Sequence, residues 1–226
     1  MHGLDTFLSE PEWINPPWKD EVAISQHPLH TLLDIAYQVV PEVVLARQNR
    51  QWTMTDLKDR LRRLDRLERQ LNEWEHILIH DHHGMLIKEK EAEWDGLHHT
   101  AYDFATLSGG MSFAMYTGVR VKMACTMNRI MGDILVVDGM ADVDTITPVM
   151  EGLEWSRRAL RCLEYFHTGS PKVTGYIATL FPLDAAWAYL SCIELNVHTD
   201  VSKERDFCVA TAQRLSEMKI PVFRWR

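Results

Sequence analysis

The sequence predicts an all-α protein, an irregular multi-helix bundle. Apolar residues recur at intervals of three and four over long stretches, which is the spacing of one face of a helix. No stretch shows the sustained apolar–polar alternation, bounded by turn residues, that is typical of half-buried strands. The 226 residues suit one domain, with an extended lead-in over 1–27 and a helical core over 28–226.

The lead-in carries three prolines and two tryptophans, so we expect extended backbone with aromatic anchors there. Pro28 suits the first turn of a helix, and we expect Pro41 to end or kink that helix. The apolar residues between these two prolines recur at helical spacing: Leu29, Leu32, Leu33, Ala36, Val39 and Val40.

A long amphipathic helix is predicted to follow. Thr53 and Asp56 resemble the capping box that opens a helix. Seven apolar residues then recur at steps of three and four: Leu57, Leu61, Leu64, Leu67, Leu71, Trp74 and Leu78. Basic and acidic residues alternate on the other faces, which indicates a solvated, salt-bridged surface.

The next predicted helical region runs from about Glu89 to Val137, with interruptions near Gly96 and Gly109–Gly110. Three further helices are expected over Asp144–Phe166, Leu183–Leu195 and Lys203–Met218. Within the stretch Phe181–Leu190 we expect Pro182 in a first turn and Trp187 fully buried. This stretch should pack against the helix that contains Leu160 and Leu163, whereas Arg157, Arg158 and Arg161 should form a solvated face.

Charge and cysteine content limit the partners. Lys and Arg number 24 against 32 Asp and Glu, a net charge of −8, so we expect no direct nucleic-acid binding. The longest uncharged run is short and broken by glycine and serine, and no signal peptide is visible, so no membrane association is expected. Four cysteines, none in a CxxC pair, indicate buried reduced thiols and a nuclear or cytoplasmic location: Cys125, Cys162, Cys192 and Cys208.

Six of the 11 histidines fall between His76 and His99, which raises the question of a metal site. His76 and His80 have the four-residue spacing that can chelate a metal on a helix, and Asp81, His82 and His83 could add ligands. The stretch lacks an HExxH motif, and the interpretation we favour is a histidine-rich surface turn. We therefore expect no bound metal and no cofactor.

Five polar residues interrupt the most apolar region and are the candidate catalytic residues: Tyr102, Asp103, Tyr116, Arg120 and Asp133. They could supply acid–base groups beside a pocket, although an internal network of hydrogen bonds and salt bridges is the favoured interpretation. Four methionines of this region could line a pocket for a hydrophobic small molecule, or simply fill the core: Met111, Met115, Met123 and Met127.

Two stretches carry a resemblance to a known family. The first is FLSEPEWINPPWKD followed by HPLHTLLDIAYQVVPEVV, and the second is RALRCLEYFHTGSPKVTGYIATLFPLDAAWAYL. Their order and spacing resemble the C-terminal part of the regulatory domain of fungal zinc binuclear cluster transcription factors, the fungal-specific transcription factor domain. That family reads DNA through six clustered cysteines, which four dispersed cysteines cannot build. The resemblance implies a helical regulatory domain without the DNA-reading part.

Two functions remain open from the sequence. The first is a stand-alone regulatory protein that binds another protein, such as a full-length transcription factor of the same secondary-metabolite pathway. The second is a cofactor-free enzyme of secondary metabolism, of the cyclase, isomerase or dehydratase type, with an apolar helical pocket and a few acid–base residues. A closed apolar pocket with convergent polar groups would favour the enzyme, and a large exposed apolar surface would favour the regulator. The resemblance favours the regulator.

Overall fold

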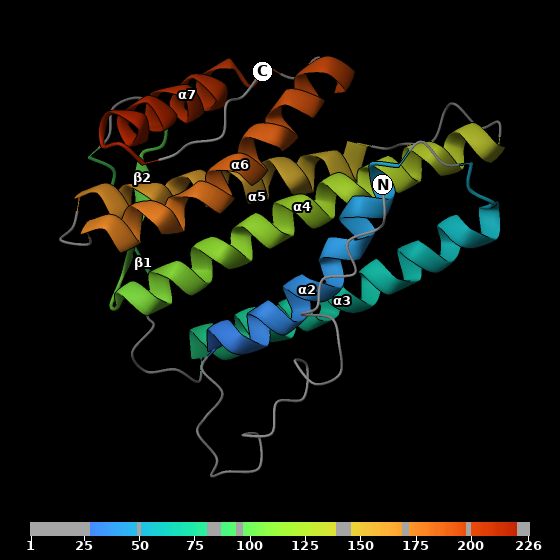
Figure 1. Cartoon of the computed structure of the whole chain (residues 1–226), viewed down its shortest axis with the longest axis horizontal. Coiled ribbons are helices and arrows are strands. Elements are labelled where there is room, and N and C mark those ends of the chain that lie inside the picture. The colour runs from blue at the N-terminus through green and yellow to red at the C-terminus, as the bar shows by residue number, and fades with distance from the viewer. Residues whose placement is uncertain are drawn as a thin grey trace, which may run out of the picture.

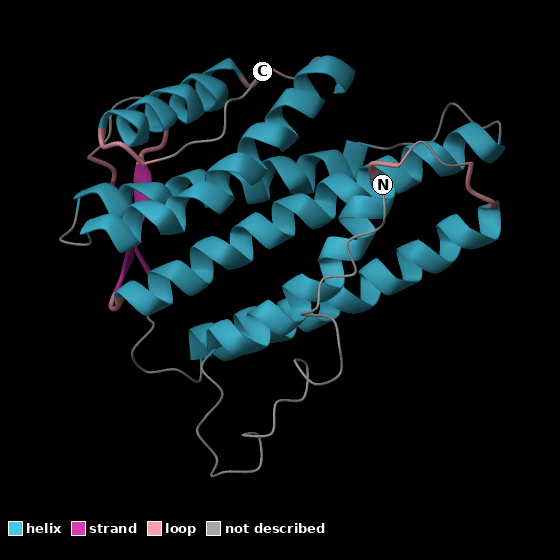
Figure 2. Cartoon of the chain, in the orientation of Figure 1, coloured by secondary structure: helices cyan, strands magenta, loops and turns pink. Residues whose placement is uncertain are grey.

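A computed structural model describes residues 28–48, 51–80, 87–93, 97–138, 146–168, 172–197 and 200–220. Over these residues the chain has six helices and one two-stranded antiparallel sheet, which confirms the all-α class (Figure 2). The predicted lead-in over 1–27 lies outside the described residues.

The helices pack around α4, the central helix of the bundle (Figure 1). On one side of α4 lie α2 and α3, on the other lie α5 and α6, and α7 packs on α6. The bounds are α2 Pro28–Ala46, α3 Met54–His80, α4 Leu107–Asp138, α5 Ile146–Thr168, α6 Lys172–Val197 and α7 Ser202–Glu217. A helix that is apolar around its whole circumference belongs in a core, and α4 contributes to both hydrophobic clusters of this protein.

The predicted long amphipathic helix is confirmed as α3. Thr53 Oγ1 accepts a hydrogen bond from the backbone N–H of Asp56, at 3.2 Å. Asp56 in return accepts one from the backbone N–H of Thr53, also at 3.2 Å. This is the reciprocal capping box, built with Asp in place of Glu. The apolar face of α3 is buried against α2 and α4.

The helix that opens with Pro28 does not end at Pro41. That proline lies inside α2, which continues to Ala46. Its inner face is buried, with Leu32, Ile35 and Val39 at most 6% exposed.

The helix predicted from Glu89 is wrong in its first part. Residues Ile87–Glu91 and Thr100–Phe104 form strands β1 and β2, and α4 begins only at Leu107. Each strand has five residues, so the alternation in β2 of buried Tyr102, exposed Asp103 and buried Phe104 is too short to stand out in the sequence.

Gly109 and Gly110 do not interrupt the predicted helix, because they lie in the first turn of α4. A β-carbon on Gly110 would lie 2.9 Å from the ring of Tyr165 and 3.1 Å from that of Phe104. The glycine therefore lets the two aromatic rings approach the backbone of α4.

The last part of the sequence prediction is partly confirmed. Leu183, Ala186 and Leu190 are buried in one cluster with Leu160 and Leu163 of α5, as expected. Helix α6 begins at Lys172, however, so Pro182 lies inside the helix and not in its first turn. Trp187 is half-buried, which corrects the expectation of full burial. Its ring lies under the guanidinium of Arg205 in α7, at 5.0 Å.

Candidate functional site

Two of the candidate catalytic residues, Tyr116 and Arg120, lie together in the core between α3 and α4. Both are almost fully buried. Arg120 Nε donates a hydrogen bond to the Tyr116 hydroxyl at 3.0 Å, and that hydroxyl donates to Glu75 Oε2 at 2.9 Å. Arg120 also donates a hydrogen bond to Asn72 of α3, and it forms an ion pair with Glu68 of the same helix at 3.3 Å. All three guanidinium nitrogens of Arg120 therefore have a hydrogen-bond or ion-pair partner.

Trp155 of α5 joins this network through its ring. The guanidinium carbon of Arg120 lies 4.8 Å from the ring centre, and that of Arg158 lies 4.3 Å from it. Arg158 also pairs with Glu75 at 2.7 Å, so one carboxylate serves both Tyr116 and Arg158. Cation–π contacts and shared ion pairs tie three helices together here.

Burial sets the acid–base character of this network. It raises the pKa of the Tyr116 phenol, with Arg120 opposing the effect. It also raises the pKa of the Glu68 carboxyl, and the negative charge of Glu151 adds to that rise. Tyr116 therefore stays neutral at physiological pH, and Glu68 is the carboxyl of this network whose protonated form burial favours. Sequence reasoning missed Glu68 because it belongs to the charged faces of α3.

Two of the four candidate pocket methionines, Met123 and Met127, line a crevice with Arg120, Glu68 and Trp155. Its volume is about 90 Å³, well below the ~300–1,000 Å³ usual for ligand sites. Met111 and Met115 do not line it. They pack against the hydrophobic cluster to which α2, α3, α4, α5 and β2 contribute.

Of the other three candidate residues, Tyr102 reaches this network through a hydrogen bond with Arg158, whereas Asp103 and Asp133 lie apart from it. The Tyr102 ring is covered by the guanidinium of Arg161, at 4.2 Å, and its hydroxyl accepts a hydrogen bond from Arg161 Nη1. Asp103 is exposed on β2, opposite Lys88 of β1. Asp133 lies half-buried in the last two turns of α4. The structure does not gather the five candidates into one site.

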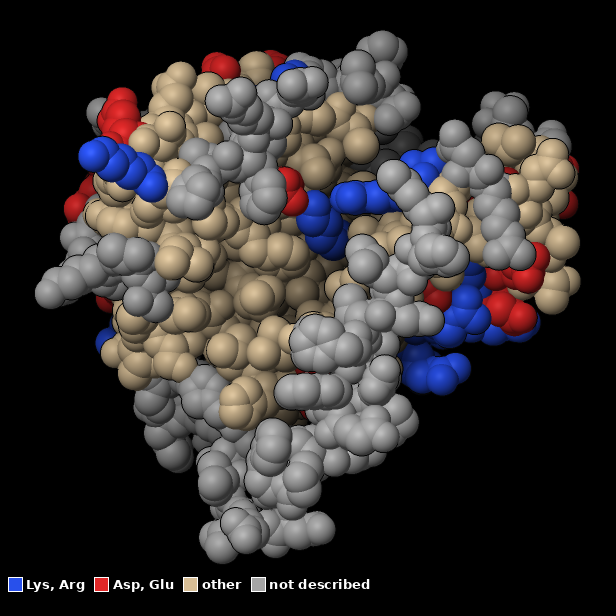
Figure 3. Space-filling view, viewed as in Figure 1, with Lys and Arg blue, Asp and Glu red and all other residues tan. Residues whose placement is uncertain are grey.

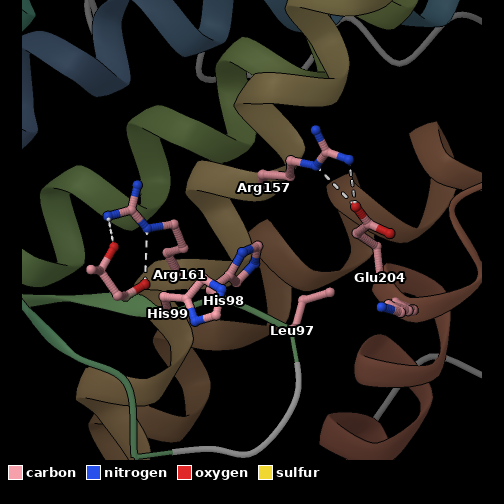
Figure 4. Close-up of a pocket in the computed structure, with 8 residues that line it drawn as sticks. Leu97, His98, His99, Arg157, Arg161 and Glu204 are labelled. Atoms are coloured by element: carbon pink, nitrogen blue, oxygen red, sulfur yellow. Dashed lines mark hydrogen bonds and ion pairs between the residues drawn. The ribbon is translucent and has the colours of Figure 1, made fainter.

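A concavity with a volume of about 470 Å³ lies where β2, α5 and α7 meet (Figure 4). His98 and His99 enter it from the residues before β2, and Arg157 and Arg161 come from α5. Lys203 and Glu204, from the first turn of α7, complete the wall. The sequence drew attention to the two histidines, but nothing in it placed α5 and α7 beside them.

Ion pairs hold the walls of this concavity. Arg157 pairs with the buried Glu204 at 2.9 Å. Arg161 donates to the Thr100 carbonyl at 3.1 Å and pairs with Glu89 at 2.8 Å. Arg161 and Arg158 have side chains only 16% and 23% exposed, so the predicted solvated arginine face of α5 is wrong for these two.

His98 is the titratable residue that this environment changes most. Burial lowers the pKa of its imidazole to about 4, and the positive charges of Arg161 and Arg157 add to the effect while Glu204 opposes it. The imidazole is therefore neutral at physiological pH. His98 is half-buried and His99 is exposed, and neither lies in a helix.

The histidines at the end of α3, which the sequence offered as metal ligands, form no metal site within the described part of the chain. His76 is exposed on α3. The side chain of His80 and residues Asp81, His82 and His83 lie outside the described residues. Among the residues that are described, no three His, Cys, Asp or Glu side chains are placed to hold a metal ion.

Helix α2 presents an apolar surface to solvent. Three residues spaced three and four apart share its outer face: Tyr37, Val40 and Val44, at 38%, 47% and 45% exposure. We call these three residues the α2 stripe. Elsewhere on the face seen in Figure 3, uncharged side chains dominate, and basic and acidic side chains are intermixed along α3.

Two helices are long and apolar enough to cross a membrane by length and composition alone, over Leu29–Ala46 in α2 and Gly175–Ile193 in α6. Core helices of water-soluble proteins meet the same criterion, so the finding is weak support for a membrane span. Both helices pack on α4 in this structure.

The fold and the sites define a mostly helical protein in which the buried Arg60 and Arg120 pair with carboxylates of neighbouring helices. Comparison with protein-family models, with curated proteins and with solved structures gives no match.

Proposed function

We propose that this chain is a stand-alone regulatory protein that binds another protein, derived from a fungal transcription factor effector domain and linked to a secondary-metabolite pathway. The resemblance of two long stretches to the fungal-specific transcription factor domain motivates the proposal. The observation that carries it is the α2 stripe. The proposal places the protein in the nucleus or cytoplasm, without direct contact to nucleic acid.

The α2 stripe has the form of a helix-binding surface. Exposed apolar residues scattered singly need no explanation, but three on one helix face form a continuous row. The exposed residues beside the row include the polar Asp34 and Gln38, and the apolar Pro41 extends the row. A partner helix with an apolar stripe and polar flanks would match this row. A regulatory domain of the same family would offer such a helix, and that is the occupant we propose.

Buried ion pairs indicate that α2 stays packed on α3 when the partner binds to its outer face. Glu42, on its inner side, pairs with Arg60 at 2.8 Å and with Arg63 at 2.7 Å, both from α3. Arg60 and Glu42 have side chains only 1% and 6% exposed. Releasing α2 into a membrane would leave these charges without partners, at a cost of several kcal/mol per ion. Binding on the outer face leaves the pairs intact.

The test uses a purified full-length zinc binuclear cluster transcription factor from the same organism, mixed with this chain. Val40→Asp with Val44→Asp should weaken the complex at least about tenfold, equal to ~1.4 kcal/mol, because an unpaired charge would enter an apolar interface. Ile177→Asp on α6, at a residue 56% exposed, is the matched control and should leave affinity unchanged. Equal loss in both variants, or no complex with the wild-type chain, would contradict the proposal.

The alternative, a cofactor-free enzyme, finds support in one observation. Glu68, whose pKa is raised, lies beside Arg120 at the crevice lined by Met123 and Met127. The small volume of that crevice and the full pairing of Arg120 count against it, because a hydrophobic metabolite would have to displace core side chains. Tight, saturable binding of a terpene- or polyketide-like ligand that Glu68→Gln abolishes would reverse this preference.

A further inference from the structure

Two cysteines that are far apart in the sequence meet in the structure. The thiol of Cys125 on α4 hydrogen-bonds the thiol of Cys192 on α6. Cys192 is exposed and Cys125 is half-buried, so the pair opens to solvent from one side. Cys162 and Cys208 are buried, which confirms for them alone the prediction of buried thiols. The exposure of Cys192 corrects it.

Positive charges surround the pair. Lys122 and Arg129 lie on the same helix as Cys125, and Arg47 follows α2. The hydrogen bond from Cys125 lowers the pKa of the Cys192 thiol to about 6, with burial opposing and these cations assisting. The pKa of Cys125 is raised in turn, first by the same bond and then by burial. Lys122 also pairs with Asp184 of α6, at 2.9 Å, which holds α4 and α6 together close to the thiols.

The reactivity of the two sulfurs is therefore divided. At neutral pH Cys192 is a thiolate and Cys125 is the thiol that donates to it, which is the arrangement of an attacking and a resolving cysteine. Burial raises the pKa of Cys162 and of Cys208 to about 12 each. These two remain protonated and shielded.

We propose that Cys192 and Cys125 form a peroxide-responsive pair that closes into a disulfide between α4 and α6. The oxidant is a hydroperoxide, with hydrogen peroxide as the simplest member. The Cys192 thiolate attacks one peroxide oxygen and the O–O bond breaks, which gives a sulfenic acid on Cys192 and hydroxide. The Cys125 sulfur then attacks the Cys192 sulfur, and the S–O bond breaks with loss of one water. Sulfur is oxidised by two electrons overall, and the peroxide is reduced to water.

The disulfide would link two helices that already pack against each other, at the place where the two thiols interact. It would join two helices that share a hydrophobic cluster, to which α4 contributes Val121 and α6 contributes Leu183 and Leu190. This inference does not rest on the proposed protein-binding role, since the α2 stripe takes no part in it.

The experiment counts thiols in the purified full chain. After treatment with a small excess of hydrogen peroxide and removal of the oxidant, the chain is unfolded and alkylated with N-ethylmaleimide. Two of the four cysteines should escape alkylation, and peptide mapping should link Cys125 to Cys192. Cys162 and Cys208 of the same molecules are the internal control and should be fully alkylated. Dithiothreitol should restore all four thiols.

Two variants separate the roles of the sulfurs. Cys192→Ser should abolish peroxide-dependent protection, whereas Cys125→Ser should leave a sulfenic acid on Cys192 that dimedone traps. In the untreated protein, the rate of Cys192 alkylation should rise with pH with a midpoint near 6. Four alkylated cysteines after peroxide, a crosslink that includes Cys162 or Cys208, or unchanged protection in Cys192→Ser would each overturn the proposal.

Discussion

The ring of Tyr189 on α6 lies directly against the Cα of Gly152 on α5, in the space that a β-carbon at this position would occupy. Its hydroxyl accepts a hydrogen bond from Asn128 of α4, at 3.1 Å. One tyrosine therefore joins three helices, and it does so because residue 152 has no side chain.

Gly152→Ala should destabilise the protein by ~1–3 kcal/mol, since the methyl group would push the Tyr189 ring out of a packed core. Gly132→Ala is the matched control: it lies in α4 with nothing within 4 Å of the added carbon. That change should stabilise by up to ~1 kcal/mol through helix propensity. Urea unfolding of both variants decides the matter, and equal effects would contradict the close approach.

Arg60→Met should lower the free energy of unfolding by ~3 kcal/mol, because Glu42 would remain buried with one of its two arginines removed. The lower end of the usual range is expected since Arg63 stays in place. Arg62→Met removes an exposed pair with Asp59, with the Arg62 side chain 72% exposed, and should cost less than ~1 kcal/mol. A small cost for Arg60→Met, comparable with that of Arg62→Met, would mean that Glu42 reaches water.

Stability should fall as the pH decreases from about 6.5 to about 4, because the folded-state pKa of His98 is lowered from 6.5 to about 4. Between these two pKa values the imidazole is protonated in the unfolded chain but not in the folded one. Lowering the pH therefore stabilises the unfolded state relative to the folded state. Burial also lowers the pKa of His167 to about 4, so this residue adds to the dependence of stability on pH. Thermal unfolding at stepped pH should show a shallower decline for His98→Gln, and an unchanged slope would show that His98 is protonated in the folded protein.

Trp187→Ala should cost clearly less than Phe166→Ala, although tryptophan is the larger residue. Phe166 is fully buried, and its truncation should cost ~3–5 kcal/mol. Trp187 is half-buried and loses mainly one face of contact and the Arg205 guanidinium above its ring. Denaturant midpoints compare the two directly. The opposite order would restore the fully buried Trp187 that the sequence indicated.

Periodicity predicted the helices whose apolar stripes are long. α3 could be read almost residue by residue because its leucines all face one core and its capping box is local. The hairpin of β1 and β2 escaped the same reasoning, since five-residue strands give a pattern too brief to separate from a helix. Trp187 was misplaced because α6 is apolar nearly all round, so spacing alone could not tell which of its residues face the core.

The sites could be predicted only in part. The sequence named Tyr116 and Arg120 as polar residues in an apolar region, and the structure joins them. Their partners Glu75 and Glu68 looked like ordinary surface charges of α3. Contacts between distant segments, such as Cys125 with Cys192, leave no local trace in a single sequence, because they depend on how α4 and α6 cross.

The central position of α4 has a consequence for the chain during its synthesis. Helices α2 and α3 leave the ribosome before their shared partner α4, which ends at Asp138, 58 residues after α3 ends at His80. At ~5–20 residues per second, about 3 to 12 seconds pass before α4 is complete and can cover the apolar faces of α2 and α3. We therefore expect chaperones to bind the nascent chain during this interval. Faster synthesis of residues 81–138 should shorten the time for which they remain bound.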